Sequence, residues 1–415
     1  MTRSFLVLTL SLGMLFLATC GKQEPEISAP ASGAGAARPA DQDAGKPPAA
    51  RAASAIDRAI QFLQPYHDKK SGKVGFSPQD PVGSGHPAFS AMAALCYVNS
   101  PRRYDVEKDG PIVRNILQWL VSLQNADGSI YDESNANYVT SLALRAFVAA
   151  GDPRYQDVIV RARDFLVGLQ AREDTGYQPS DRFYGGIGYG SSIRPDLSNA
   201  HFAIQAVKDA GLPEDHPFYQ RAQRFLERCQ NWSETNDLVV KDEDGNEIRP
   251  GNDGGGYYAP GESKIGVEVQ ADGTRVLKSY GSMSYALLKS YVFCGVKKQD
   301  PRVKAVVSWC QNHFDLDRHP GFPTDGDGKA AYQGLYYYYL TMAMCLRAYG
   351  ETEFDLPDGT KVNWAEAMIE KILGLQQADG GWVNEKNGRW QEGSEALCTL
   401  YAVMALEECL AALAS

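Results

Sequence analysis

The chain has 415 residues, enough for two or three ordinary domains or for one large one. Its 44% hydrophobic and 22% charged residues are typical of a soluble globular protein, and its formal net charge is -10. This acidic balance, with no stripe rich in lysine and arginine, argues against a nucleic-acid partner.

Residues 1–20 differ from the rest of the chain. Arg3 precedes the apolar run FLVLTLSLGMLFLA, which is too short and too close to the N-terminus for a typical membrane span. The run ends in Leu17-Ala18-Thr19-Cys20, which resembles the lipobox of bacterial lipoproteins. This resemblance implies a signal peptide over residues 1–20 and a lipid on Cys20. The protein would then be exported to the cell envelope, facing the periplasm or the cell surface, with the anchor as its only membrane contact. Thr19 is less usual before the cysteine than Gly, Ala or Ser, so a secreted protein is the alternative.

Residues 21–52 consist mainly of Ala, Pro, Gly, Ser and Gln, with hardly a large apolar side chain. Such a stretch cannot bury enough surface to offset the entropy of ordering it, so we predict a disordered tether. Residues 53–415 then form one folded domain. Its seven cysteines lie in apolar runs without metal-binding spacing, so we expect buried small hydrophobes and no zinc cluster.

Two kinds of helical segment alternate six times along residues 53–415. The first kind is FLQPYHDKKSGKVGF (62–76), WLVSLQNADGSIY (119–131), FLVGLQAREDTGY (165–177), FLERCQNWSETND (225–237), WCQNHFDLDRHPGF (309–322) and KILGLQQADGGW (371–382). One position of this frame holds Gln124, Gln170, Gln230 and Gln376, and the same position holds His67 in the first repeat and Phe314 in the fifth. The irregular spacing of the segments indicates loops of variable length on a constant helical frame.

A second apolar segment follows each of these. The six are PAFSAMAALCYV (87–98), YVTSLALRAFVAAG (138–151), SNAHFAIQAVKDAG (198–211), YGSMSYALLKSYVFCG (280–295), YYYYLTMAMCLRAYG (336–350) and SEALCTLYAVMALEEC (394–409). The first kind of helix carries charge on one face and should meet solvent, whereas the second kind is apolar nearly all round and should be buried. Buried helices inside a ring of solvated ones predict an all-α (α/α)6 toroid of six helix pairs.

Loops between the helices contain short hairpin patterns. The stretches 238–250, 264–280 and 354–364 each alternate around an Asp-Gly turn, so we predict small β-hairpins in these loops.

The motif Gln-x-x-Asp-Gly-Gly-Trp at 376–382, with a weaker copy at 124–129, resembles the QW repeat of squalene and oxidosqualene cyclases and of protein prenyltransferase β-subunits. All six repeats take part, so the resemblance covers roughly residues 55–412. We read the glutamines and the aromatic residues after each turn as structural, because a glutamine amide satisfies free backbone groups at helix ends.

The resemblance implies a functional cavity inside the ring, at the starts of the inner helices. The cyclases carry Asp-x-Asp-Asp-Thr there, and the middle aspartate protonates the substrate. On this chain the motif falls on Asp196-Leu197-Ser198-Asn199-Ala200, so Ser198 stands at the protonating position and Asn199 replaces its neighbour. A hydroxyl group cannot protonate an alkene, and the Asp, Cys and His zinc ligands of the prenyltransferases are also unmatched. We therefore expect neither family chemistry, and no metal or other cofactor.

Asp196 and His201 form one remaining candidate acid/base pair, because an imidazole near a carboxylate titrates in a useful range. The alternative is that Asp196 or Ser198 caps a helix and that His201 is a satisfied cavity residue. Carboxylates near the predicted mouth could also pair as in glycosidases. They are Asp181, Asp253, Glu262, Asp325, Glu392 and Glu395.

Aromatic residues gather at the predicted starts of the inner helices. We expect the cavity to be lined by Ser198, Asn199, Tyr138, Asp253, Tyr257, Tyr280, Tyr285 and Tyr336. Such a lining suits an apolar or isoprenoid-like small molecule, and equally a glycan or protein partner. The sequence therefore leaves open whether the protein is an enzyme. It favours a ligand- or partner-binding member of the family without cyclase or prenyltransferase activity. The alternative is an enzyme that acts on an isoprenoid or a glycan through Asp196 and His201 or through paired carboxylates.

Overall fold

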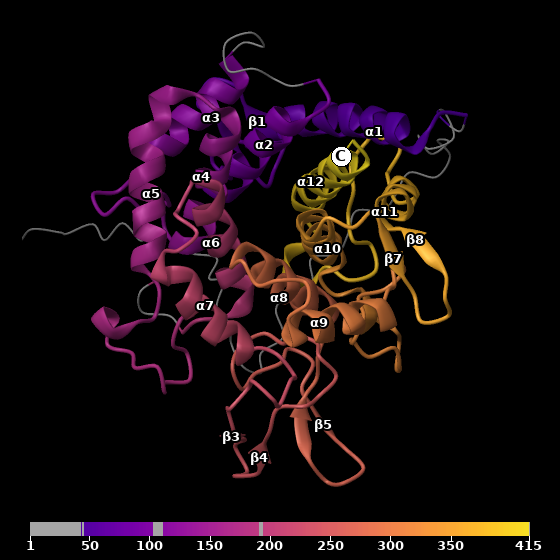
Figure 1. Ribbon diagram of the computed structural model, residues 1–415. Helices are drawn as coiled ribbons and strands as arrows, with labels where there is room; N and C mark the ends of the chain where they lie inside the picture. Colours follow the sequence, from indigo (N-terminus) through magenta and orange to yellow (C-terminus); the bar gives the residue numbers. More distant parts are fainter. Residues whose placement is uncertain (1–42, 44, 103–110, 191–193, 415) are drawn as a thin grey trace, which may run out of the picture.

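The computed structural model describes residues 43, 45–102, 111–190 and 194–414, which contain twelve α-helices in two alternating sets (Figure 1). The outer set is α1 (Pro48–Leu63), α3 (Pro111–Ser122), α5 (Gln156–Gly168), α7 (Pro217–Glu227), α9 (Pro301–Asn312) and α11 (Trp364–Leu373). The inner set is α2 (Pro87–Asn99), α4 (Ala136–Ala150), α6 (Leu197–Asp209), α8 (Gly281–Phe293), α10 (Leu335–Tyr349) and α12 (Glu395–Leu413). Short 3-10 turns span Gln64–Tyr66, Pro153–Tyr155, Glu173–Thr175, Lys329–Tyr332 and Arg389–Gln391.

The inner helices form a closed ring. Each packs against the next inner helix in chain order, and α12 packs against α2. The outer helices α3, α5, α7, α9 and α11 pack on inner helices that adjoin them in the chain. The helix α1 lies against α11 and α12, so the first and last pairs meet. The predicted all-α (α/α)6 toroid of six helix pairs is confirmed.

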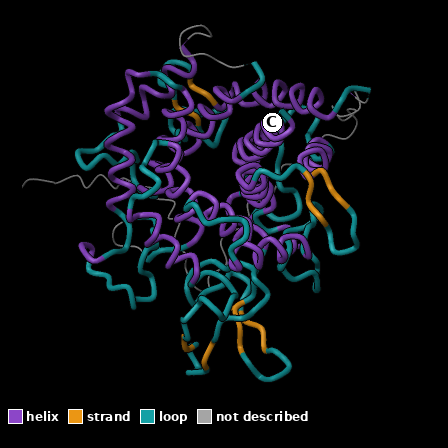
Figure 2. Tube along the Cα trace, viewed as in Figure 1, coloured by secondary structure: helices purple, strands orange, loops and turns teal. Residues whose placement is uncertain are grey.

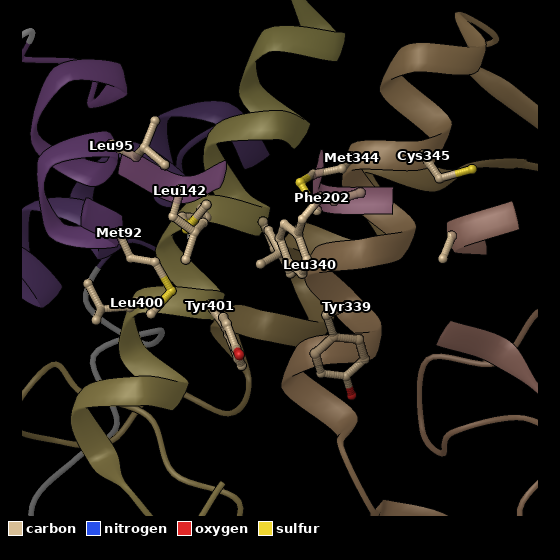
Figure 3. Packing of buried hydrophobic residues seen from close by; sticks show 14 of the residues in the cluster. Met92, Leu95, Leu142, Phe202, Tyr339, Leu340, Met344, Cys345, Leu400 and Tyr401 are labelled. Atoms are coloured by element: carbon tan, nitrogen blue, oxygen red, sulfur yellow. The ribbon is translucent and has the colours of Figure 1, made fainter. Parts of the chain in front are cut away.

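Burial separates the two sets as their composition predicts. The outer helix α5 buries only Ala162 and Leu166, whereas the inner helix α6 buries every residue from Asn199 to Val207. In Figure 3, side chains of α2, α4, α6, α10 and α12 reach toward one another, among them Met92, Leu142, Phe202, Leu340 and Tyr401. The interior of the ring is therefore packed with side chains. The seven cysteines among the described residues are free and buried.

The repeated glutamines join successive outer helices. The Nε2 of Gln170 donates to the carbonyls of Gly185, at 3.0 Å, and of Phe218 in α7, at 2.9 Å. The same pair of bonds runs from Gln124 to Gly128 and Val158, from Gln230 to Gly254 and Arg302, and from Gln376 to Gly380 and Ala55. The bond from Gln376 reaches α1, so this set of contacts also spans the junction between the last and the first repeat.

Glycine is required in these turns because the next outer helix comes very close. Gly185 has φ +84, and a Cβ there would overlap the carbonyl of Arg221 in α7. Gly72, Gly128, Gly254 and Gly380 also have positive φ and meet backbone carbonyls of α3, α5, α9 and α1 in the same way. The repeat motif thus joins neighbouring helix pairs through hydrogen bonds and close backbone contacts.

Four two-stranded antiparallel hairpins lie in the loops of the described part of the chain (Figure 2). They are β1 (His67–Asp68) with β2 (Lys73–Val74), β3 (Val240–Lys241) with β4 (Glu247–Ile248), β5 (Val267–Val269) with β6 (Arg275–Leu277), and β7 (Glu353–Asp355) with β8 (Lys361–Asn363). The last three are the predicted hairpins. The first was not predicted, because residues 67–74 contain no Asp-Gly turn between alternating residues.

The predicted signal peptide and Cys20 lie outside the described residues. The helix α1 begins at Pro48, so residues 48–52 belong to a helix and not to the predicted tether. Pro48 suits the first helical position, and the alanines that follow favour helix and become buried, as at Ala52 and Ala55. The helix α12 is long and apolar enough to cross a membrane, but 78% of that stretch is buried, as in a core helix of a globular domain.

Candidate functional site

The start of α6 is organised by the side chain of Asp196. Its Oδ1 accepts a hydrogen bond from the backbone N–H of Asn199 at 2.8 Å, and its Oδ2 accepts one from Nδ2 of Asn199 at 2.9 Å. Asp196 thus caps the helix, with an extended backbone at φ -144. The carboxyl group is buried, and this burial raises its pKa to about 6 despite the stabilising bonds from Asn199.

Ser198, one residue into the helix, faces the axis of the ring. Its Oγ lies 2.9 Å from the hydroxyl of Tyr337 in α10. The same hydroxyl lies 2.8 Å from Nε2 of His201, so Tyr337 bridges two residues of α6 across the ring. Nearby, the hydroxyls of Tyr138 in α4 and Tyr401 in α12 lie 3.2 Å apart.

We call Tyr138, Tyr337 and Tyr401 the central tyrosine cluster. The ring centroids of Tyr337 and Tyr401 are 6.1 Å apart, and the ring of Tyr138 meets that of Phe202 edge-on at 5.1 Å. Side chains from four inner helices therefore meet here, near the N-terminal ends of α4, α6 and α10 and further into α12.

Two tyrosines of this cluster and Ser198 are more exposed than Tyr401 and than the residues one turn further along the axis. Ser198, Tyr138 and Tyr337 are half-buried. Leu142, Phe202 and Leu340 have at most 1% of their surface exposed. We call Ser198 and the three tyrosines the floor, because they lie directly before this more deeply buried apolar layer of the ring axis.

Charged side chains occupy the axis beyond this apolar layer. Lys289 of α8 is fully buried and donates to Oε1 of Gln205 in α6 at 2.8 Å. Arg145 of α4 pairs with Asp209 of α6 at 3.1 Å and lies 3.9 Å from Glu408 of α12. Burial, and secondarily the positive charge of Arg145, lowers the pKa of Lys289 to about 7. This polar layer links four of the inner helices on the far side of the apolar layer.

Asp196 and His201 do not act on each other as a hydrogen-bonded pair. Asp196 is engaged by Asn199, and the Nε2 of His201 is engaged by Tyr337. The reason is helical geometry: successive residues turn by about 100°, so side chains five positions apart point in clearly different directions. Burial lowers the pKa of His201 well below its usual value, and the charges of Lys289 and Arg145 add to this effect.

The predicted lining residues separate into two groups. Tyr138, Ser198 and Asn199 lie at the floor or directly behind it, where Asn199 also meets the side chain of Asn137. The other five have structural partners elsewhere. Asp253 caps a turn at Gly255, and the hydroxyl of Tyr336 donates to the carbonyl of Val383. The remaining three pack in the core: Tyr257 with Ile248 and Leu277, Tyr280 on His319 and Phe322, and Tyr285 against Tyr338.

The candidate carboxylates also have separate partners. Asp181 accepts from the N–H of Gln178, Glu262 pairs with Arg194 and Lys264, and Glu395 accepts from the hydroxyl of Tyr66. The buried Glu392 accepts from the N–H of Tyr337 at 2.8 Å and caps α10, and burial raises its pKa to about 7. Asp325 is exposed. These contacts are those of caps and ion pairs, and they bring no two of the six carboxylates into contact.

Two residues of the floor were not among the predicted lining residues, Tyr337 and Tyr401. The run Tyr336–Tyr339 marks the start of an inner helix, but its four side chains point in four directions. Only the partner across the ring identifies the one that faces the axis. Tyr401 lies further into α12, beyond the expected start.

Backbone strain gathers near the same end of the ring. Among the described residues other than glycine, positive φ angles occur at Asn135 (φ 60), Trp390 (φ 57) and Gln391 (φ 65). Asn135 directly precedes α4, and the other two lie in the loop before α12. Strained conformations of this kind cost free energy and are concentrated at functional sites.

A cavity of about 380 Å³ lies elsewhere, at the loops of the fourth repeat. It is lined by Ser233, Asn236, Asp237, Val239, Arg249, Pro250, Gly251, Asn252, Gln270, Asp272 and Thr274. None of the predicted site residues lines it. Within the residues that the structure describes, no group of three or more His, Cys, Asp or Glu side chains is placed to hold a metal ion.

Comparison with known proteins gives a fold but no family. No family model and no curated protein sequence matches the chain. The structure is similar to the apo type II terpene cyclase MstE from Scytonema, with a TM-score of 0.50 and 14% identity over 88% of this chain and 100% of that one. A tyrosine-to-phenylalanine variant of that cyclase, also in the apo form, gives a TM-score of 0.51 with 14% identity, over 89% and 98% of the two chains. An α-1,6-mannanase variant (GH76A of Salegentibacter sp. HEL1_6) in complex with α-1,6-mannotetrose gives 0.48 with 12% identity, over 87% and 99%. The chain is thus a helical toroid of the kind found in terpene cyclases.

Proposed function

We propose that this protein is a divergent member of the squalene cyclase and prenyltransferase superfamily that binds an uncharged, isoprenoid-like small molecule on its central tyrosine cluster without protonating it. The observation that carries the proposal is the position of Ser198. The residue at the protonating position of the family motif faces the ring axis and bonds to Tyr337, but it is a hydroxyl group.

The carboxyl group in this motif, that of Asp196, caps a helix. Asp196 is buried and holds Asn199 at the start of α6, so neither of its oxygens is directed to the floor by the bonds it makes. The floor itself consists of aromatic rings and hydroxyl groups. Such a surface favours contact with neutral molecules through apolar area and through single hydrogen bonds.

Binding can be measured from the intrinsic fluorescence of the purified domain, with squalene in detergent and mannotriose as the two probes. We expect squalene to bind and mannotriose not to bind. Tyr337→Phe should weaken squalene binding, because the ring then loses the bonds that fix its orientation. Tyr349→Phe, at the far end of the same helix α10, is the matched control and should bind as the native protein does.

Two results would contradict the proposal. Binding of mannotriose in place of squalene would indicate a glycan ligand. Conversion of squalene to a cyclic product, detected by mass spectrometry after incubation, would show that chemistry remains and would support the enzyme alternative.

We propose further that the protein is exported and anchored by a lipid on Cys20, with residues following it as a spacer. The support is the lipobox-like sequence Leu17-Ala18-Thr19-Cys20. In a bacterial host fed with an alkyne-tagged fatty acid, the native chain should carry the label and sediment with membranes. Cys20→Ser should lose both properties. A native chain that is cleaved but unlabelled would instead be a secreted protein.

A further inference from the structure

The hydrogen bonds that hold Tyr337 have a direction, and this direction restricts the ligand. Three polar groups stand in a row at the floor: Nε2 of His201, the hydroxyl of Tyr337 and Oγ of Ser198, with separations of 2.8 and 2.9 Å. Each hydroxyl can donate one hydrogen bond and accept others. The ring nitrogen of His201 that carries the proton therefore determines the direction in which the hydrogen bonds of this row are donated.

His201 is a neutral imidazole. Its side chain has 0% of its surface exposed, and Lys289 of α8 and Arg145 of α4 add positive potential. Its aromatic neighbours Phe202, at 4.2 Å between ring centroids, and Tyr337 carry no charge that would favour a second proton. A neutral ring carries one N–H group, on Nδ1 or on Nε2.

The surroundings of Nδ1 favour Nε2 as the site of that proton. Nδ1 is buried and has no hydrogen-bond partner among the residues that the structure describes. An N–H group left there would be a buried donor without an acceptor, and such donors are rarer and costlier in proteins than unpaired acceptors. With the proton on Nε2, His201 donates to Tyr337, and Tyr337 donates to Ser198. The O–H of Ser198 is then left without an acceptor inside the row.

Ser198 is half-buried, so its free O–H is within reach of a molecule above the floor. We propose that Ser198 donates a hydrogen bond to the ligand, and that the ligand carries an uncharged oxygen, as an alcohol, ether, ketone or ester, at the end that meets the floor. This inference rests on the proposed function and makes it narrower: a pure hydrocarbon would leave the serine donor unpaired. The opposite proton position would make Ser198 a donor to Tyr337 and would present only an acceptor.

The proton position can be measured without any ligand. In a long-range proton–nitrogen correlation spectrum of protein labelled with ¹⁵N-histidine, the His201 signals are assigned by their loss in His201→Gln. We expect the pattern of a neutral ring protonated on Nε2. A ring protonated on Nδ1, or on both nitrogens, would overturn the inference.

The ligand requirement is tested with farnesol and farnesene, which differ in a hydroxyl group on the same kind of chain. Farnesol should bind about tenfold more tightly, the effect of one good hydrogen bond. Ser198→Ala should abolish this preference. Ser122→Ala, whose hydroxyl bonds to Trp119 on the outer helix α3, should retain it. Equal binding of the two probes would contradict the ligand requirement while leaving the proposed function in place. If neither probe bound, the proposed function would fail for this ligand class, and the tautomer measurement would still decide the direction of the row.

Discussion

Asp196 shows at the scale of one residue how a position in a helix decides what a carboxyl group does. The sequence places it in a stretch that resembles the Asp-x-Asp-Asp-Thr motif of the cyclases, yet its two oxygens bind the backbone and side chain of Asn199. Its raised pKa is a cost of burial, because the charged form has left water. A perturbed pKa here accompanies a structural cap and not, by itself, a catalytic acid.

The cost of that burial predicts a pH-dependent stability for Asp196→Asn. The pKa of Asp196 is raised from 3.8 to about 6, so this residue favours folding most below pH 4 and loses that advantage as the pH rises to 6. Asparagine can keep the cap through its amide oxygen and carries no charge, and it gives up only the second bond, from Nδ2 of Asn199. The variant should therefore be more stable than the native protein at pH 7.5, by up to about 3 kcal/mol, and not at pH 4. Urea unfolding at both pH values measures the difference.

Asp300 provides the control, because it also caps a helix, the outer helix α9, but next to the positive charge of Arg302. Its bonds to Arg302 lower its pKa. Asp300→Asn should therefore lose stability at pH 7.5. If Asp196→Asn were destabilising at pH 7.5 as well, the charged form of Asp196 would be favourable and the burial argument would be wrong.

At the scale of elements, the first repeat departs from the others at one position. His67 occupies the place of the bridging glutamines, only 5% of its surface is exposed, and neither of its ring nitrogens has a hydrogen-bond partner within the described part of the chain. The junction with α3 is held instead by Asn115, whose Nδ2 donates to the carbonyl of Lys69 at 2.6 Å. The turn itself is unchanged, since Gly72 still meets the carbonyl of Asn115.

His67→Gln should therefore stabilise the protein. A glutamine there can donate to the carbonyl of Gly72 and to the first turn of α3, as Gln124 does for Gly128 and α5. The expected gain is about 1 kcal/mol in the free energy of unfolding, measured by urea denaturation. The reverse change Gln124→His should lose about as much or more. A loss of stability in His67→Gln would show that the first junction has a different spacing from the rest.

The elements were largely predictable, because the information for them is local. The six helix pairs follow from hydrophobic pattern and repeat, and three hairpins follow from Asp-Gly turns between alternating residues. The floor was only partly predictable. Ser198 and Tyr138 could be placed from helix starts, but Tyr337 could not be separated from Tyr336, because that choice depends on helix rotation and on the partner across the ring.

At the scale of the whole molecule, the ring axis consists of a hydroxyl-rich floor, an apolar layer and a charged layer. The apolar and charged layers fill the axis beyond the floor, so the described part of the ring has no continuous polar path along its axis. The charged layer costs free energy of folding, because Lys289 is fully buried. Its ammonium group contacts a neutral hydrogen-bonding partner, Gln205, and an aromatic ring, Phe202.

Lys289→Met should raise the stability of the protein at pH 7, by about 2 kcal/mol after the loss of the bond to Gln205. The pKa of Lys289 falls from 10.5 to about 7 on folding, so the unfolded chain binds more protons between these values. The stability of the native protein should consequently rise with pH in this window, and the advantage of the variant should shrink toward pH 10.

Thermal unfolding at several pH values, with the exposed-surface change Lys298→Met as control, tests this prediction. A variant that is less stable at pH 7 would mean that the ammonium group is well satisfied in the interior. The charged layer would then be a source of stability and not a cost.

The junction between α1 and α11 also determines where a pulling force would act on the ring. Gln376 and Arg51 tie the first helix to the last outer helix, through Ala55 and Glu370. A pulling force on the N-terminal end of α1 would load these side-chain contacts together with the packing of α1 on α11 and α12. If the protein is held by its N-terminal end, this junction is the point at which tension would open the ring.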